Sequence, residues 1–163
     1  MKFQCTNEHK QIEWDDAKIV SCKYQNNILE FVLQSAIIKA HNSQNARFQD
    51  MVCNEIILQL KNAEIVRVVR EGMKYYDANG TLQREIPDED IPAPGQSAIL
   101  KRVAGGTIFT TVEDEAAQGY ALELGIDIPK EEEEDEIDTF WLCVTFDESY
   151  ACWERYCSPA EGN

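Results

Sequence analysis

The segment from Asp77 to Asp90 carries acidic and amide side chains at a spacing that could bind calcium. An EF-hand loop needs oxygen ligands at alternating positions, a glycine at its sixth position and a glutamate at its twelfth. With Asp77 first, those two positions are Leu82 and Asp88, so both requirements fail. The order Asp77-Ala78-Asn79-Gly80 instead fits a hairpin loop, in which the aspartate bonds to the backbone and the glycine supplies a positive φ. We therefore predict a turn here and no metal site.

The most unusual chemistry lies in residues 113–138, where twelve acids and one base contribute 1 − 12 = −11 to the formal net charge of −15. The rest of the chain is nearly balanced, with 14 bases and 18 acids. One interpretation is a solvated connection whose charges resist aggregation. The other is a docking surface that steers a basic protein toward it. The candidate docking residues are Glu131, Glu132, Glu133, Glu134, Asp135, Glu136 and Asp138.

The six cysteines include no CxxC pair, so the sequence signals neither a thioredoxin-like redox site nor a zinc knuckle. Residues 139–146 and 149–156 alternate as strands, and we expect a hairpin around Asp147 and Glu148. That hairpin would place Cys143 directly opposite Cys152. The two thiols would then form either a redox-responsive pair or two buried, reduced side chains.

One face of the same expected hairpin carries aromatic side chains and is less polar than a face fully exposed to solvent would be. It carries Trp141, Cys143, Tyr150 and Cys152. Such a face either lies under another part of the chain or lines a pocket or a partner surface. Both interpretations stay open at this point.

Histidine is scarce, and both His9 and His41 lie in polar surroundings, which predicts surface loops. Cys5 and His9 are four residues apart, a spacing that also fits a nucleophile and its base. No glycine-rich phosphate loop, GxSxG elbow or HExxH helix is present. We therefore expect no cofactor and no catalytic residues.

The elements that would position these groups are mostly strands. Apolar and polar residues alternate with a period of two along much of the chain. Residues 62–76 also fit helical spacing, but their β-branched side chains favour a strand. In the hairpin at Asp77 we expect Tyr76 opposite Leu82 and Lys74 opposite Arg84. The predicted strands are 17–24, 28–38, 54–60, 62–76, 97–103, 107–112, 120–128, 139–146 and 149–156, with loops at 41–50, 87–95 and 131–138.

This pattern predicts an all-β fold, an antiparallel β-sandwich or barrel-like meander of about nine or ten strands with little helix. The length of 163 residues fits a single domain, 1–163, with an acidic irregular segment at 113–138. The sequence contains no run of about 18 apolar residues, so we predict no transmembrane helix. The first ten residues lack the apolar core of a secretory signal, so we expect a cytoplasmic protein of bacterial type.

The segment WDDAKIVSCKYQNNILEFVL, Trp14 to Leu33, resembles the opening of certain small bacterial β-sandwich families of unknown function, some of them grouped with immunity proteins. The resemblance covers about the first 60 residues. Where those families usually have a histidine, this chain has Trp14-Asp15. The resemblance implies a β-sandwich and carries over no catalytic residue.

Together these observations predict a non-catalytic protein-interaction module, immunity-like, that binds a basic partner through its acidic segment. The alternative is a small-molecule-binding β-module or minor enzyme with a pocket near Trp141, Tyr150 and Cys152. The charge disfavours nucleic acid and anionic membranes as partners, because phosphate contacts need a concentrated Lys/Arg surface. An exposed edge strand would also offer a route to a homodimer.

Overall fold

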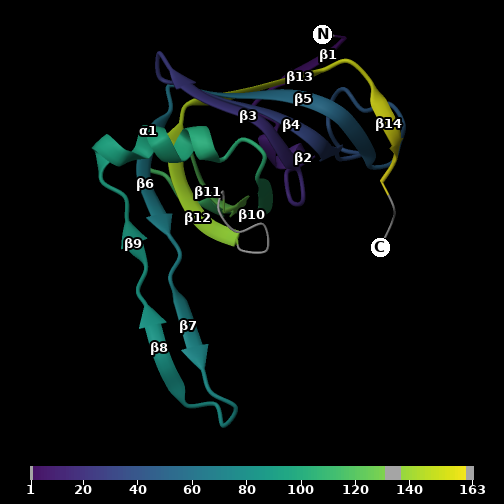
Figure 1. Cartoon of the computed structure of the whole chain (residues 1–163). Coiled ribbons are helices and arrows are strands. Elements are labelled where there is room, and N and C mark those ends of the chain that lie inside the picture. Colours follow the sequence, from purple (N-terminus) through teal and green to yellow (C-terminus); the bar gives the residue numbers. More distant parts are fainter. Residues whose placement is uncertain (1, 131–136, 161–163) are drawn as a thin grey trace.

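The computed structural model describes residues 2–130 and 137–160 (Figure 1). This part of the chain forms fourteen strands, one α-helix and a short 3-10 turn at His9–Gln11. The strands are β1 (Phe3–Thr6), β2 (Ile12–Glu13), β3 (Lys18–Gln25), β4 (Ile28–Ile38), β5 (Met51–Lys61), β6 (Glu64–Arg70), β7 (Met73–Tyr76), β8 (Leu82–Ile86), β9 (Glu89–Asp90), β10 (Thr107–Asp114), β11 (Tyr120–Pro129), β12 (Ile137–Phe146), β13 (Glu148–Trp153) and β14 (Tyr156–Pro159), and the helix is α1 (Ala93–Arg102).

Twelve of these strands form one curved antiparallel sheet, in the order β1-β13-β5-β4-β3-β10-β11-β12-β6-β9, with β14 and β2 at its sides. The sheet has two halves, one from β1 to β3 and one from β10 to β9. A short stretch joins them, in which Thr107 pairs with Lys18 and backbone hydrogen bonds link residues 16–19 to residues 105–108. Strands β7 and β8 form a separate two-stranded sheet. The predicted all-β, antiparallel character is confirmed, and the strands outnumber the nine or ten expected.

The core lies between the two halves, because side chains from both belong to one buried cluster. Phe31 of β4 and Leu58 of β5 come from one half, and Ile126 of β11 and Phe140 of β12 from the other, and all are at most 1% exposed. Burial alternates residue by residue along β12, as the period of two requires.

The predicted strand at 97–103 is wrong, because residues 97–102 belong to α1 and Val103 is its C-cap. Pro92 caps the helix and Pro94 sits in its first turn, where a missing backbone N–H costs little. The residues that follow include Ala98, Leu100 and Lys101, which are good helix formers. None of the helices in the described part of the chain has the length and apolar character to cross a membrane.

The predicted hairpin of residues 139–146 with 149–156 is also wrong. Strand β12 pairs with β11 and β6, whereas β13 pairs with β5 and β1. The chain passes from one half of the sheet to the other at Asp147, whose N–H donates to the Lys61 carbonyl and whose carboxylate accepts a hydrogen bond from Asn62. Alternation fixes which face a residue occupies, but it does not fix which strand is the neighbour.

The strand predicted at 120–128 is confirmed as β11, and both ends of the acidic segment 113–138, which was expected to be irregular, also lie in strands. The segment's first two residues end β10, residues 120–129 form β11, and residues 137 and 138 begin β12. Among its described residues only 115–119 and Lys130 lie outside strands. The loop at 41–50 is irregular, as predicted.

Candidate functional site

A hairpin of β7 and β8 projects from the body of the molecule (Figure 1). We call residues 73–86 the arm. The arm continues the ribbon formed by β6 and β9, which pair at Val69 with Asp90 and at Arg70 with Glu89. Its own ladder joins Met73 to Ile86 and Tyr76 to Leu82. The arm is therefore a two-stranded ribbon, with no sheet layer packed on either face.

The tip of the arm is the turn predicted from Asp77-Ala78-Asn79-Gly80. The Asp77 carboxylate accepts hydrogen bonds from the backbone N–H groups of Asn79 and Thr81, both at 2.9 Å, and from the Gln83 side chain at 3.1 Å. Gly80 has a φ of +79°, the left-handed conformation that the turn requires. The turn prediction is confirmed. The described residues contain no group of three or more His, Cys, Asp or Glu side chains that could hold a metal ion.

The predicted pairing of Tyr76 with Leu82 is confirmed, but beyond it the register of the arm differs from prediction by one residue. The ladder shifts between Tyr75 and Tyr76, so Tyr75 faces Arg84 and Lys74 faces Glu85. This bulge places Arg84 over the Tyr75 ring, 5.1 Å from its centroid, and brings Lys74 Nζ to 4.0 Å from Glu85. The predicted pairing of Lys74 with Arg84 is therefore wrong, and the bulge removes the like-charge contact that it implied.

The root of the arm, where it joins the body, is held by more contacts than the rest of the hairpin. A Cβ on Gly72 would lie 2.0 Å from the carbonyl oxygen of Ile86, so only glycine fits where the two segments of the backbone pass each other. The Gly72 N–H donates to Asp88 at 2.7 Å, and the Glu71 N–H donates to the Thr139 carbonyl of β12 at 2.8 Å. These bonds fix the point at which the arm leaves the body.

Every residue of the arm is exposed, including five large apolar side chains. The register puts Met73, Tyr75 and Ile86 on one face and Tyr76 and Leu82 on the other. Tyr76 is 58% exposed and Met73 is 50% exposed. An isolated hairpin is marginally stable in water, and clustered exposed apolar groups mark interaction sites. The arm thus has the composition of a contact surface that a partner would cover.

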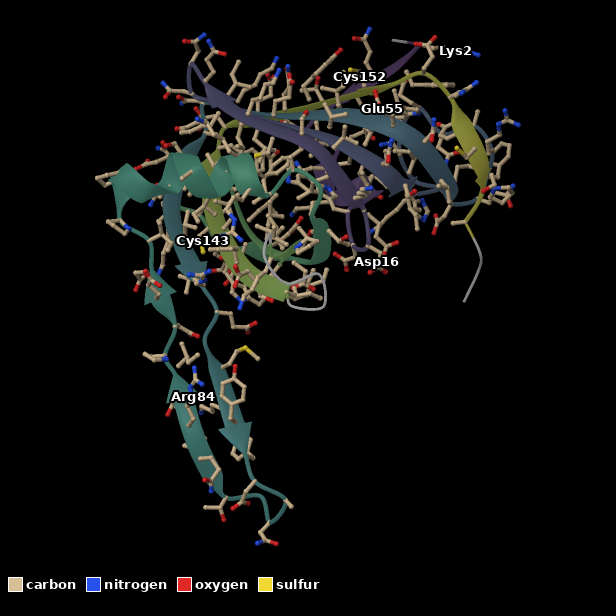
Figure 2. All side chains as sticks on the ribbon, viewed as in Figure 1. Lys2, Asp16, Glu55, Arg84, Cys143 and Cys152 are labelled. Atoms are coloured by element: carbon tan, nitrogen blue, oxygen red, sulfur yellow. The ribbon has the colours of Figure 1, made fainter. Side chains whose placement is uncertain are left out.

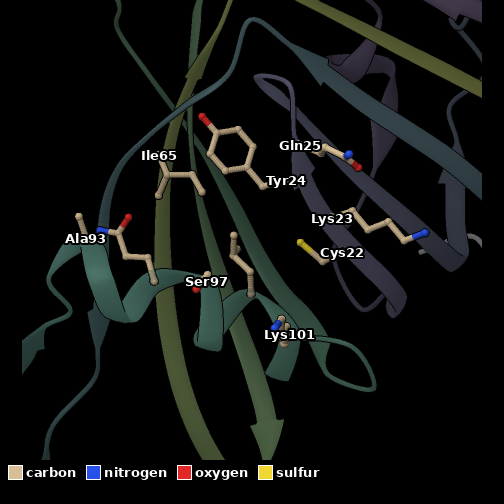
Figure 3. Close-up of a pocket in the computed structure, with 10 residues that line it drawn as sticks. Cys22, Lys23, Tyr24, Gln25, Ile65, Ala93, Ser97 and Lys101 are labelled. Atoms are coloured by element: carbon tan, nitrogen blue, oxygen red, sulfur yellow. The ribbon is translucent and has the colours of Figure 1, made fainter.

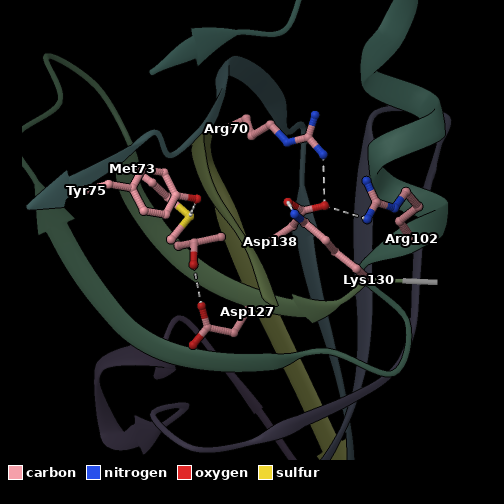
Figure 4. A network of polar contacts seen from close by, with 8 residues as sticks. Arg70, Met73, Tyr75, Arg102, Asp127, Lys130 and Asp138 are labelled. Atoms are coloured by element: carbon pink, nitrogen blue, oxygen red, sulfur yellow. Dashed lines mark hydrogen bonds and ion pairs between the residues drawn. The ribbon is translucent and has the colours of Figure 1, made fainter. Parts of the chain in front are cut away.

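A cluster of charged side chains lies beside the root of the arm (Figure 4). Arg70 of β6 and Arg102 of α1 each donate to the same carboxylate oxygen of Asp138, both at 2.9 Å, and Lys130 Nζ lies 4.0 Å from its other oxygen. Both guanidinium groups also lie over the Phe140 ring, at 5.7 and 5.6 Å from its centroid. The cluster ties β6, α1 and β12 together where the core ends.

The Asp138 side chain is only 10% exposed. Burial alone would raise the pKa of its carboxyl, but hydrogen bonds from Arg70 and Arg102 outweigh that effect, and the pKa lies below the ordinary value of 3.8. Asp138 is therefore an internal counter-ion rather than part of an exposed docking surface. The other predicted docking residues, Glu131, Glu132, Glu133, Glu134, Asp135 and Glu136, lie outside the described residues.

The four residues of the predicted pocket are not brought together. Trp141 and Cys143 lie on β12, and Trp141 packs edge-on against Phe109 with ring centroids 5.4 Å apart. Tyr150 and Cys152 lie on β13 in the other half of the sheet, where the Tyr150 hydroxyl donates to Gln4. Figure 2 shows Cys143 and Cys152 well apart. Cys143 faces Arg67 and Glu123 across the ladder, so the predicted Cys143–Cys152 pair does not form. All six cysteines are free thiols.

His9 is buried, contrary to the prediction of a surface loop. It is 4% exposed, and its ring meets Tyr120 and Phe146 edge-on at 4.6 and 5.1 Å. Its Nδ1 shares a hydrogen bond of 2.8 Å with the Ser149 hydroxyl. Cys5 forms no pair with His9; its thiol accepts a hydrogen bond from Asn42, and burial raises its pKa to about 11. Neither residue is therefore arranged as a nucleophile or base.

The comparisons with family models, curated proteins and solved structures give no match to this chain.

Proposed function

We propose that this chain is a non-catalytic protein-interaction module whose contact element is the arm and whose partner is a basic protein. One observation carries the proposal: five large apolar side chains stand exposed on a two-stranded ribbon that projects from the body. Aromatic residues and methionine are enriched at the buried centres of protein interfaces. Burying these side chains against a partner would also stabilise a hairpin that is weak on its own.

The charge of the molecule supports a basic partner. The arm itself is neutral, since Lys74 and Arg84 balance Asp77 and Glu85, 2 − 2 = 0. The whole chain carries −15, so two copies repel each other and a positively charged protein is attracted. In this proposal Glu131–Glu136 contribute to the attraction, and the arm provides the apolar contact.

We also interpret the two halves of the curved sheet as the layers of an antiparallel β-sandwich. That is the architecture of the small bacterial families, some grouped with immunity proteins, that the segment from Trp14 to Leu33 resembles. An immunity-like role, in which the module covers a basic protein, agrees with an exposed apolar arm on an acidic body.

The test is capture of a basic protein from the source cell by the tagged full chain. The arm variant Tyr76→Ser/Leu82→Ser should lose the captured protein. The control variant Val20→Ser/Val112→Ser removes apolar groups that are 41% and 43% exposed on the body, and it should keep capture unchanged. Raising the salt concentration should weaken capture by the parent chain, because screening shortens the reach of its charge.

Equal capture by the arm variant and the parent chain would contradict the proposal. So would a captured protein that is acidic, or capture that does not depend on salt. Far-UV circular dichroism of each variant shows whether the body remains folded, so that a loss of capture reports on the arm.

A further inference from the structure

A cavity lies at the seam between the two halves of the sheet, beyond the short stretch that joins them. Strand β3 pairs with β10 at Lys18, and Ile19 forms backbone hydrogen bonds with Gly105 and Gly106, so only β3 beyond Ile19 presents an unpaired edge on that side. Strand β6 pairs with β9 only at Val69 and Arg70, which leaves its first half as a second unpaired edge. Helix α1 lies against β3 over this gap, as helices often cover sheet edges (Figure 1).

The seam cavity measures about 460 Å³, within the range of small-molecule sites. Figure 3 shows that its walls come from β3, β6 and α1. Their side chains include Ile65, Leu100, the Tyr24 ring and the Cys22 thiol. Burial raises the pKa of Cys22 to about 12, so this thiol is neutral and forms part of an apolar wall. The Tyr24 hydroxyl is already engaged, donating to the Ala63 carbonyl at 2.6 Å.

The charged residues around the seam cavity are positive, whereas the whole chain carries a net negative charge. Its ten lining residues include Lys23 and Lys101 and no aspartate or glutamate, although the chain has 30 acids and 15 Lys and Arg residues. Gln25, Gln96 and Ser97 add neutral polar groups at the rim. An apolar interior with amines at its edge is complementary to a molecule with an apolar body and one negative charge.

We propose that the seam cavity binds a small amphipathic anion, an aliphatic chain that ends in a carboxylate. The aliphatic part lies between Ile65, Tyr24 and Leu100, and the carboxylate lies at the rim near Lys101. This binding does not depend on the arm, which is a separate element. It therefore adds a ligand site to the protein-interaction role proposed above.

The experiment titrates the full chain with octanoate, 1-octanol and octylammonium, three probes of one chain length and different charge, and follows backbone amide resonances by NMR. Octanoate should give saturable shifts in β3, β6 and α1, with a lower dissociation constant than either other probe. Lys101→Gln should weaken octanoate binding about two- to fivefold, the range of a partly exposed ion pair, and leave octanol binding unchanged. Lys2→Gln is the control for loss of charge elsewhere.

A second pair of variants tests the location. Ala93→Trp places a large ring at a lining position of α1 and should abolish binding. Ala98→Trp places the same ring at an exposed position of the helix that does not line the cavity, and it should leave binding unchanged. The arm variant Tyr76→Ser/Leu82→Ser should also bind octanoate normally, which separates this site from the interaction function.

Three results would overturn the proposal. The first is octanoate shifts that do not saturate or that fall outside the seam. The second is octylammonium binding as tightly as octanoate. The third is equal weakening by Ala93→Trp and Ala98→Trp.

Discussion

At the scale of single residues, Asp138 shows how burial and charge combine. Two arginines converge on one buried carboxylate oxygen, and both also stack on Phe140. The sequence places Asp138 in an acidic run, which suggested an exposed surface. Its partners Arg70 and Arg102 are 68 and 36 residues away along the chain, so no local pattern could predict the cluster. The Asp138 carboxylate is needed inside the molecule, where it neutralises the guanidinium groups of Arg70 and Arg102 at the end of the core.

Replacing Asp138 with asparagine should destabilise the fold. The variant leaves Arg70 and Arg102 without their counter-ion, and we expect the free energy of unfolding at pH 7 to fall by about 1–3 kcal/mol, measured by urea denaturation. Asp90→Asn is the matched control, because Asp90 also pairs with an arginine, Arg67, but in solvent. The control should unfold like the parent chain. Equal stability of Asp138→Asn and the parent would contradict this role.

The same group sets a direction for the pH dependence. The pKa of Asp138 is lower in the folded state than in the unfolded chain. Its contribution is therefore complete above the ordinary value of 3.8 and is lost as the pH falls through the folded pKa. The stability difference between parent and Asp138→Asn should shrink in that acidic window.

His9 should make stability depend on pH in a different window. Burial lowers its pKa below the ordinary 6.5, while Glu113 acts in the opposite direction and Lys10 adds to the lowering. As the pH falls, His9 is therefore protonated in the unfolded chain before it is protonated in the folded one. The free energy of unfolding should then fall as the pH drops below about 6.5. Thermal unfolding from pH 7.5 to pH 5 measures this slope. His9→Gln should flatten it, and an unchanged slope in that variant would rule His9 out as the cause.

At the scale of elements, alternation predicted where most strands lie. Strands β4, β5, β11 and β12 each fall on segments with a period of two, and the turn at Asp77 was predicted from its residue types. The pairing of strands was not predictable in the same way. Alternation along β12 and β13 is satisfied equally by a hairpin and by two strands in different halves. Helix α1 did leave a signal that was overlooked, namely Pro92 and Pro94 before a run of helix formers.

The arm illustrates the same limit. Its turn chemistry predicts a hairpin, but exposed and covered hairpins have similar alternation, so the sequence did not reveal that the arm lacks a covering layer. The seam cavity was also missed, since its walls come from β3, β6 and α1, which are distant in the chain. Both features depend on contacts that no local pattern records.

The arm should open locally without unfolding the body. Its residues are exposed, and a two-stranded ribbon has few apolar contacts to hold it. In hydrogen exchange, amides of β7 and β8 should exchange faster than those of β4 and β5. Asp77→Ala removes the acceptor for two backbone N–H groups at the tip and should speed exchange in the arm alone. Protection of the arm equal to that of β4 would contradict this view.

At the scale of the whole molecule, apolar contact and charge are separated. The arm has no net charge and exposes five large apolar side chains, whereas residues 113–138 carry −11 of the net −15. Charge on the body would speed the encounter with a basic partner, and the arm would hold the complex. A second copy of the chain has the same exposed arm but also the same negative charge, so we expect a complex with a different, basic protein rather than a homodimer.

Photo-crosslinking from the arm is the decisive measurement for a basic partner. A photoreactive phenylalanine analogue at Tyr76 and the same analogue at Val112, on the body, are compared in the source cell. We expect one salt-sensitive adduct with a basic protein from Tyr76 and none of that adduct from Val112. An adduct of Tyr76 with a second copy of the chain, or the same adduct from both positions, would contradict this expectation.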